Sequence, residues 1–108
     1  MTNSLNAEPA SVFAALGCAT RLDLIGRLNT GKDYSIAELT AGLELTRQAV
    51  TKHLNVLYCA GIVQRRRVGR ESRFAIQPDS IAEASRYLAA VSSQWDESIH
   101  RLRSHLEK

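Results

Sequence analysis

The hydrophobic periodicity of the chain changes at Gly61, and this change limits the possible folds more than any other feature. Before Gly61, apolar residues recur every three or four positions, which is the spacing of one face of an α-helix. After it, residues 62–68 and 71–76 form two short runs of β-branched or aromatic residues on either side of Gly69. Pro78 ends the second run. The pattern predicts a mainly α-helical chain with a small β-hairpin.

Two helices are predicted near the start of the chain. Pro9 suits the first turn of a helix, because its missing N–H costs nothing there, and Gly17 ends this helix. Thr20 is the predicted cap of the second helix, and Gly31 is the predicted residue that closes it. Leucines and an isoleucine between these two positions supply core.

A helix-turn-helix is predicted next. Ser35 and Glu38 have the spacing of a capping box, and the short helix that they start is interrupted at Gly42. Thr46 then caps a fourth helix. Two short helices joined by about three residues form a helix-turn-helix. We therefore expect a helix-turn-helix over about residues 35–61 and a two-stranded wing over about residues 62–77.

A long helix is predicted at the end of the chain, capped by Asp79 or Ser80. Its apolar residues alternate between spacings of three and four, as an a/d seam requires: Ile81, Ala84, Leu88, Val91, Trp95, Ile99, Leu102 and Leu106. A helix of this length has little of its own domain to pack on. We expect it to pack against its symmetry mate; the alternative is a helix that lies wholly on its own core.

The fourth predicted helix, residues 46–60, has one apolar and one polar face. Val50, Leu54 and Leu57 share the stripe that is expected to be buried. The opposite side carries Gln48, Thr51, Lys52, Asn55 and Cys59. Gln and Asn side chains match the edge of adenine, Lys matches guanine, and Thr matches the thymine methyl group. The pattern favours a helix that enters the major groove of DNA, although a polar outer face is common on any surface helix.

Positive charge is concentrated in the predicted wing. The chain has a net charge of +3 and a pI of about 9.2. Five of its eleven arginines lie in one stretch that contains a single acidic residue, Glu71: they are Arg65, Arg66, Arg67, Arg70 and Arg73. Such a run can simply be a solvated face. Its position after a helix-turn-helix favours contact with phosphates.

Three segments carry a family resemblance. Residues 20–22 (TRL), 49–57 (AVTKHLNVL) and 60–63 (AGIV) resemble the arsenic-repressor-type (ArsR/SmtB) winged helix-turn-helix regulators. The match extends in order from about Val12 to the last helix. The resemblance implies a homodimer whose first and last helices form the interface. It also implies a recognition helix in the major groove, a wing on the backbone or minor groove, and repression of a nearby operon.

These arguments give two sets of candidate residues. The DNA-binding candidates are Thr46, Arg47, Gln48, Thr51, Lys52 and Asn55 on the fourth helix, with Arg67, Arg70 and Arg73 on the wing. The dimer-interface candidates are Val12, Phe13, Leu88, Val91, Trp95, Ile99 and Leu102. His53, at the edge of the buried stripe, is predicted to be a packed, hydrogen-bonded histidine and not a ligand.

No metal or cofactor is predicted. The Cys-x-Cys ligand pair of many relatives aligns here with Ser35 and Ala37, and the last helix lacks the D-x-H and H-x-x-E spacings of others: it has Asp96, His100, His105 and Glu107. The last helix, with Tyr87-Leu88, Gln94-Trp95-Asp96 and Leu102 to Leu106, resembles that of the metal-independent members of the family, whose effector is often unidentified. Cys18 and Cys59 show no CxxC spacing, and a thiol-redox switch at either one is an alternative hypothesis.

Other function classes are weighed against DNA binding. The sequence has no nucleophile–base pair and no cofactor fingerprint, so it predicts no enzyme. A winged helix used as a protein-interaction module is the remaining alternative. The chain, 108 residues with 44% hydrophobic content, fits one domain over residues 1–108. The apolar run at 12–16 is too short to cross a bilayer and no basic leader precedes it, so we expect a protein of the bacterial cytoplasm.

Overall fold

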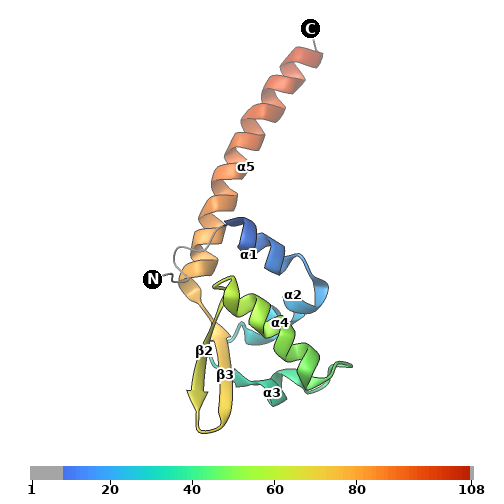
Figure 1. The fold of residues 1–108 in the computed structure, drawn as a ribbon. Helices are drawn as coiled ribbons and strands as arrows, with labels where there is room; N and C mark the ends of the chain where they lie inside the picture. The colour runs from blue at the N-terminus through green and yellow to red at the C-terminus, as the bar shows by residue number, and fades with distance from the viewer. Residues whose placement is uncertain (1–8, 108) are drawn as a thin grey trace.

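The computed structural model describes residues 9–107. Its elements follow in the order α1 Pro9–Leu16, α2 Ala19–Leu28, β1 Tyr34–Ser35, α3 Ile36–Thr40, α4 Arg47–Cys59, β2 Val63–Val68, β3 Glu71–Ile76 and α5 Pro78–Leu106. Together they form a mainly helical winged helix-turn-helix, as the sequence predicts. Figure 1 shows α5 extending away from the other elements, while α3 and the tip of the β2–β3 hairpin lie at the opposite end.

The core lies where α1, α2, α3 and α4 meet the sheet. Val50, Leu54 and Leu57 are fully buried, so the predicted apolar stripe of α4 is confirmed. α2 adds Leu24 and Leu28, and the other core residues are Val12, Ala15, Leu39, Ala60, Ile62, Val63 and Phe74. Each fully buried aliphatic side chain stabilises the fold by about 1.5–3 kcal/mol relative to exposure. This packing holds α4 by one face and leaves the other face free.

The sheet has three strands, in the order β1-β3-β2. The predicted hairpin is confirmed, with Gly69 at its turn in the positive-φ region (φ 60°) that glycine adopts without strain. The prediction of a two-stranded wing is incomplete, because β1 pairs antiparallel with β3. In this pairing Tyr34 lies opposite Phe74 and Ser35 lies opposite Arg73. A strand of two residues is too short to show a period of two in the sequence.

The caps of α3 and α4 are those that the sequence predicts. The Ser35 hydroxyl accepts the backbone N–H of Glu38 at 3.1 Å, and the Glu38 carboxylate accepts the Ser35 N–H at 2.8 Å. The Thr46 hydroxyl accepts the N–H of Ala49 at 3.0 Å. Between the two helices, Gly42 adopts a φ of 80°, which ends α3. These local contacts set the boundaries of the helix-turn-helix.

Three other predicted helix ends are wrong. α2 begins two residues earlier than a Thr20 cap allows, and Cys18 is its N-cap residue. The same helix ends at Leu28 with Asn29 as its C-cap residue, so Gly31 lies in the following turn. α5 is capped by Gln77 and not by Asp79 or Ser80, because Pro78 occupies its first turn, where no N–H is needed.

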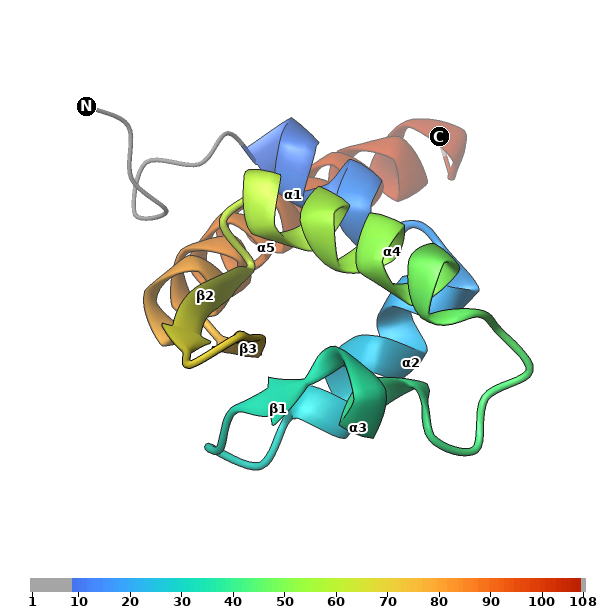
Figure 2. The ribbon, with the colours of Figure 1, turned by 60° about the horizontal axis from the view of Figure 1, so that its bottom comes forward.

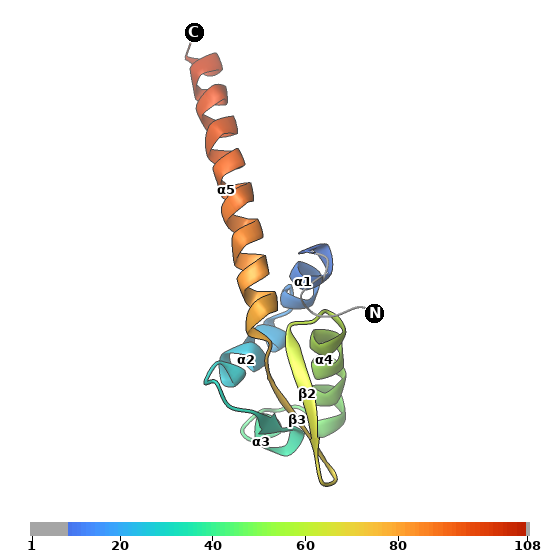
Figure 3. The same cartoon turned by 90° about the vertical axis from the view of Figure 1, so that its left-hand side faces the viewer.

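α5 is much longer than the body of the domain requires. Its 29 residues span about 43 Å at 1.5 Å per residue. Figure 3 shows that most of this length lies beyond α1 and α2. The apolar side chains of this projecting part are exposed: Leu88, Trp95, Ile99, Leu102 and Leu106. Among the residues that the structure describes, no helix is both long and apolar enough to cross a membrane.

Candidate DNA interface

The outer face of α4 carries polar side chains that are free of the core. Gln48, Lys52 and Asn55 are exposed on this face. Thr51 is half-buried, and its hydroxyl donates to the carbonyl oxygen of Arg47 at 2.7 Å. That bond occupies the hydroxyl proton, so the methyl group is the part of Thr51 suited to a thymine. Figure 2 shows that α3, α4 and the hairpin border the same end of the molecule.

The N-terminus of α4 offers backbone donors at this face. Thr46 satisfies the N–H of Ala49, whereas the amides of the first helical residues have no acceptor within the helix. Arg47 is exposed beside them. Unpaired amides and a guanidinium at a helix N-terminus form a site for a phosphate group.

The arginines of the wing separate into two groups in the structure. Arg67 and Arg70 are exposed, and neither forms an ion pair within residues 9–107. Arg65 lies over the ring of Tyr58, with its guanidinium carbon 4.3 Å from the ring centroid. This cation–π contact joins β2 to the end of α4. Arg67 and Arg70 are therefore the wing arginines available to a phosphate backbone.

Arg73 is engaged inside the protein, and its role as a phosphate contact stays a prediction. Its side chain is only 21% exposed and forms ion pairs with Asp33, Glu38 and Glu71, each at 3.0 Å. It also donates to the carbonyl oxygen of Asp33 at 3.2 Å. Arg66 forms a further ion pair with Asp33. We call these five side chains the wing clamp, because they fasten the hairpin to the segment that leads into α3.

The sequence does not indicate the wing clamp because two of its acidic members, Asp33 and Glu38, are distant from the wing in sequence. Asp33 lies 40 positions before Arg73 and has no neighbouring pattern that marks it. The hydrogen bonds from Arg66 and Arg73 hold the pKa of Asp33 below its ordinary value. The pKa of Glu38 is lowered first by the backbone N–H of Ser35 and then by the charge of Arg73. Both carboxylates are thus stabilised in their charged form.

The wing clamp gives a pH-dependent prediction. Because the pKa values of Asp33 and Glu38 are lowered by folding, their contribution to stability is complete above the ordinary carboxyl range. It is lost as the pH falls through the lowered values. Arg73→Met should therefore lower the melting temperature at pH 7. The difference in melting temperature between this variant and the wild type should become smaller towards pH 3. Thermal denaturation across this range measures it, with Arg67→Met as the control. A difference in melting temperature that does not change with pH would show that these ion pairs do not contribute to stability in solution.

His53 is confirmed as a packed, hydrogen-bonded histidine. Its Nδ1 lies 3.3 Å from Nη1 of Arg21, and its side chain is half-buried. Arg21 also donates to the carbonyl oxygens of Ala15 and Ala14 at the end of α1. Arg21 thereby joins α1 and α2 to α4, a role that its sequence position did not indicate.

The two cysteines are free thiols. Cys59 is exposed on α4, and Cys18 is half-buried at the start of α2. The backbone N–H of Arg21 lowers the pKa of Cys18, because a thiolate at a helix N-terminus accepts amide hydrogen bonds. The hypothesis of a thiol switch stays a prediction.

The candidate dimer face combines α5 with part of α1. Phe13 packs against Tyr87 of α5, with ring centroids 5.8 Å apart, and this contact sets the start of α5 against α1. Leu88, Trp95, Ile99 and Leu102 are exposed, and Val91 is half-buried. Val12 is only 3% exposed and belongs to the core of its own domain. Its place in the interface stays a prediction, which this burial disfavours.

The capped helix pair, the free face of α4 and the basic hairpin define a winged helix-turn-helix DNA-binding protein. A family model described as "Bacterial regulatory protein, arsR family" matches residues 18–65, from the start of α2 into the wing. The chain belongs to the ArsR family of helix-turn-helix transcription regulators. This family consists of DNA-binding regulators and not of enzymes.

Relatives extend this match beyond the family model. An HTH-type transcriptional regulator of Bacillus subtilis, YuzN, is 36% identical over 61% of this chain and 78% of its own length. A second HTH-type regulator, from Methanocaldococcus jannaschii, is 30% identical over 70% of this chain and 85% of its own length. The solved structure of an ArsR-like transcriptional regulator from Rhodococcus sp. RHA1 has a TM-score of 0.76 and 36% identity. That match covers 91% of this chain and 92% of the other.

Proposed function

We propose that this regulator is a homodimeric repressor of its own or a neighbouring operon that binds a palindromic operator without a metal ion. Residues 1–108 act as one winged helix-turn-helix domain in the bacterial cytoplasm. α4 enters the major groove, and the wing lies on the backbone or in the minor groove. The observation that carries the proposal is the free polar face of α4 at the same end of the molecule as Arg67 and Arg70.

Each DNA contact is assigned by the chemistry that its side chain retains. Gln48, Thr51 and Lys52 contact base edges, and Asn55 reaches a base or a phosphate. Thr46 and Arg47 hold a phosphate at the N-terminus of α4. On the wing, Arg70 enters a groove and Arg67 contacts a phosphate.

The homodimer is supported by the exposed apolar stripe of α5. A seam of this kind is too apolar and too long to be left to solvent on a small regulator. A winged helix-turn-helix domain from Mycobacterium bovis that shares this fold at 23% identity is described as homodimeric. A two-fold dimer places its two recognition helices about 34–36 Å apart, so it reads half-sites one helical turn apart.

The hydrogen bonds at the start of α3 support a regulator that needs no metal ion. At the two positions where many relatives carry cysteine ligands, this chain has Ser35 and Ala37. The Ser35 hydroxyl is bound to the N–H of Glu38, and the Glu38 carboxylate is shared between the Ser35 N–H and Arg73. These side chains are therefore committed to the cap and the wing clamp.

Repression follows from where such a dimer binds. A regulator that occupies an operator near a promoter excludes the polymerase from the same DNA. A protein from Xylella fastidiosa that shares this fold at 24% identity, BigR, is described as a transcriptional repressor. The family membership of the chain favours this role over that of a protein-docking module.

Two substitutions test the surface. Arg70→Ala should weaken binding to all DNA sequences and lower the slope of log affinity against log salt by about one, because one fewer cation lies against the DNA and releases counterions. Gln48→Ala should cost about 1–3 kcal/mol on the cognate operator and little on random DNA. Fluorescence anisotropy over a salt series measures both effects.

The control for this test is Arg86→Ala, which removes an exposed arginine from α5. Its affinity and salt slope should match those of the wild type. If Arg70→Ala and Gln48→Ala also behave like the wild type, then neither the wing nor α4 contacts DNA as proposed.

A further inference from the structure

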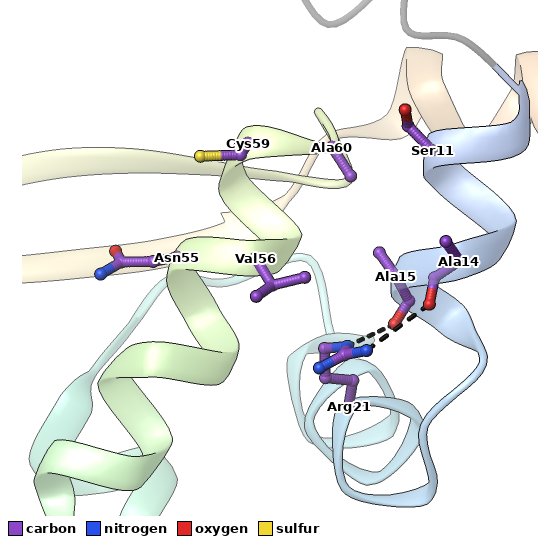
Figure 4. A pocket seen from close by; sticks show the side chains of 8 residues that line it. All are labelled: Ser11, Ala14, Ala15, Arg21, Asn55, Val56, Cys59 and Ala60. Atoms are coloured by element: carbon purple, nitrogen blue, oxygen red, sulfur yellow. Dashed lines mark hydrogen bonds between the residues drawn. The ribbon is translucent and has the colours of Figure 1, made fainter.

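A pocket of about 520 Å³ lies between α1 and α4, next to the proposed DNA-binding face. Its lining residues come from the two helices and the start of α2: Ser11, Ala14, Ala15, Arg21, Asn55, Val56, Cys59 and Ala60. Figure 4 shows Val56 and Ala60 pointing from α4 towards α1, whereas the sulfur of Cys59 points away. The volume is in the range of about 300–1,000 Å³ that small-molecule sites occupy.

A guanidinium forms the polar end of this pocket. Arg21 has five N–H donors, and three of them are directed at the Ala15 oxygen, the Ala14 oxygen and the His53 ring. Two donors, one on each terminal nitrogen, remain. No carboxylate forms an ion pair with Arg21 within residues 9–107. None of the hydrogen-bond partners of Arg21 carries a negative charge, so an anion that reaches the guanidinium gains a charge-assisted hydrogen bond.

The other walls are apolar and small. Ala14, Ala15 and Ala60 present methyl groups, and Val56 is an exposed aliphatic side chain on the α4 side. Val56 and an Arg21 that forms no ion pair with a described residue line the same pocket. This combination suits a molecule with an apolar body and an anionic end. Both parts are needed, because the alanines and the valine offer nothing to a purely polar ion.

We propose that this pocket binds a small organic carboxylate, with the carboxylate on Arg21 and the apolar body against Val56 and Ala60. The two remaining N–H groups of Arg21 match the two oxygens of a carboxylate. None of its lining residues belongs to α5 or is Phe13 of α1, so none is assigned to the proposed dimer face.

Occupancy of this pocket should weaken operator binding, a consequence that rests on the proposed function. Arg21 connects the end of α1 to His53 on α4. A ligand in the pocket lies between Arg21 and α4, and its apolar body packs against Val56 and Ala60 of the proposed recognition helix. The ligand would therefore favour an orientation of α4 that fits the operator less well.

The binding test uses the full chain without DNA. Isothermal titration calorimetry with 2-naphthoate as the probe should show binding, with the neutral amide 2-naphthamide about tenfold weaker or more, because it lacks the charge that Arg21 recognises. Acetate, which has the charge without the apolar body, should not bind measurably. Equal affinity for naphthoate and naphthamide, or no heat from naphthoate at millimolar concentration, would overturn the proposal.

A matched pair of variants locates the site. Val56→Asp places a carboxylate beside Arg21 and should reduce naphthoate affinity by about tenfold or more, through ion pairing and charge repulsion. Leu22→Asp changes another exposed apolar helix residue that does not line the pocket, and it should leave the affinity unchanged. If both variants bind naphthoate like the wild type, the probe binds elsewhere and the site is wrong.

A second titration separates this inference from the proposed function. Saturating naphthoate should reduce the affinity of the wild type for its operator and leave that of Val56→Asp unchanged. If naphthoate binds without any change in operator affinity, the proposed effect on DNA binding is wrong, whereas the proposed binding site still stands. A failure to bind operator DNA at all would overturn the proposed function, while the naphthoate titration without DNA would still decide the pocket.

Discussion

Replacing Trp95 by glutamate is expected to convert the dimer into monomers and to weaken operator binding by about 10²–10⁴-fold, because the two half-sites are then bound independently. Trp95 is 63% exposed and lies in the middle of the projecting part of α5. A carboxylate at that position would be buried in the proposed seam without a partner. The core of the domain is untouched, so the variant should fold.

Sedimentation velocity and operator titration measure the two effects of Trp95→Glu. Gln94→Glu is the matched control, since it adds the same charge at the neighbouring exposed position outside the apolar stripe. It should remain a dimer and bind DNA like the wild type. A dimeric Trp95→Glu variant with full operator affinity would mean that α5 does not form the interface.

Replacing Phe74 by alanine is expected to give the largest loss of stability, about 3–5 kcal/mol. Phe74 is 1% exposed on β3, the central strand, and lies opposite Tyr34 of β1 and Arg65 of β2. A domain of this size is stable by only about 5–15 kcal/mol, so the substitution removes a large part of the total. The melting temperature should fall by more than about 10 °C.

Thermal and urea denaturation measure the Phe74 effect, with Val68→Ala as the control. Val68 belongs to the same hairpin but is exposed, so its truncation should change stability by less than about 0.5 kcal/mol. Similar losses for the two variants would show that the hairpin is not anchored through Phe74.

The two positions differ in how far their roles could be predicted. The spacing of the apolar residues along α5 predicts Trp95 as a residue of the dimer seam. In the structure of a single chain Trp95 is exposed, which leaves its side chain free to contact a second chain. Phe74 was one apolar residue among several in the hairpin. Its importance depends on β1, which pairs with β3 from 40 positions earlier and leaves Phe74 between two strands.

α4, the proposed recognition helix, was predictable in detail because its determinants are local. Thr46 caps it through a hydrogen bond that spans three positions, and its buried stripe follows from 3.6 residues per turn. The residues on its outer face then follow from the same geometry. Which of them contact a base stays a prediction.

The wing was predictable in outline and not in its chemistry. Its turn at Gly69 and its basic character are visible in the sequence. The five arginines are equivalent there, with Glu71 as the one acidic neighbour. In the structure three of them are held by Tyr58, Asp33, Glu38 and Glu71, which leaves Arg67 and Arg70.

The sequence by itself thus determined the helix-turn-helix, the hairpin and the apolar stripe of α5, because caps, turns and periodicity act over a few neighbouring residues. The tertiary structure decided which charges remain free and which are neutralised. Asp33 reaches Arg73 across 40 positions, and Arg21 reaches His53 across 32. Such contacts exist only after the core around Leu54 and Phe74 has brought distant segments together, so no local sequence pattern could predict them.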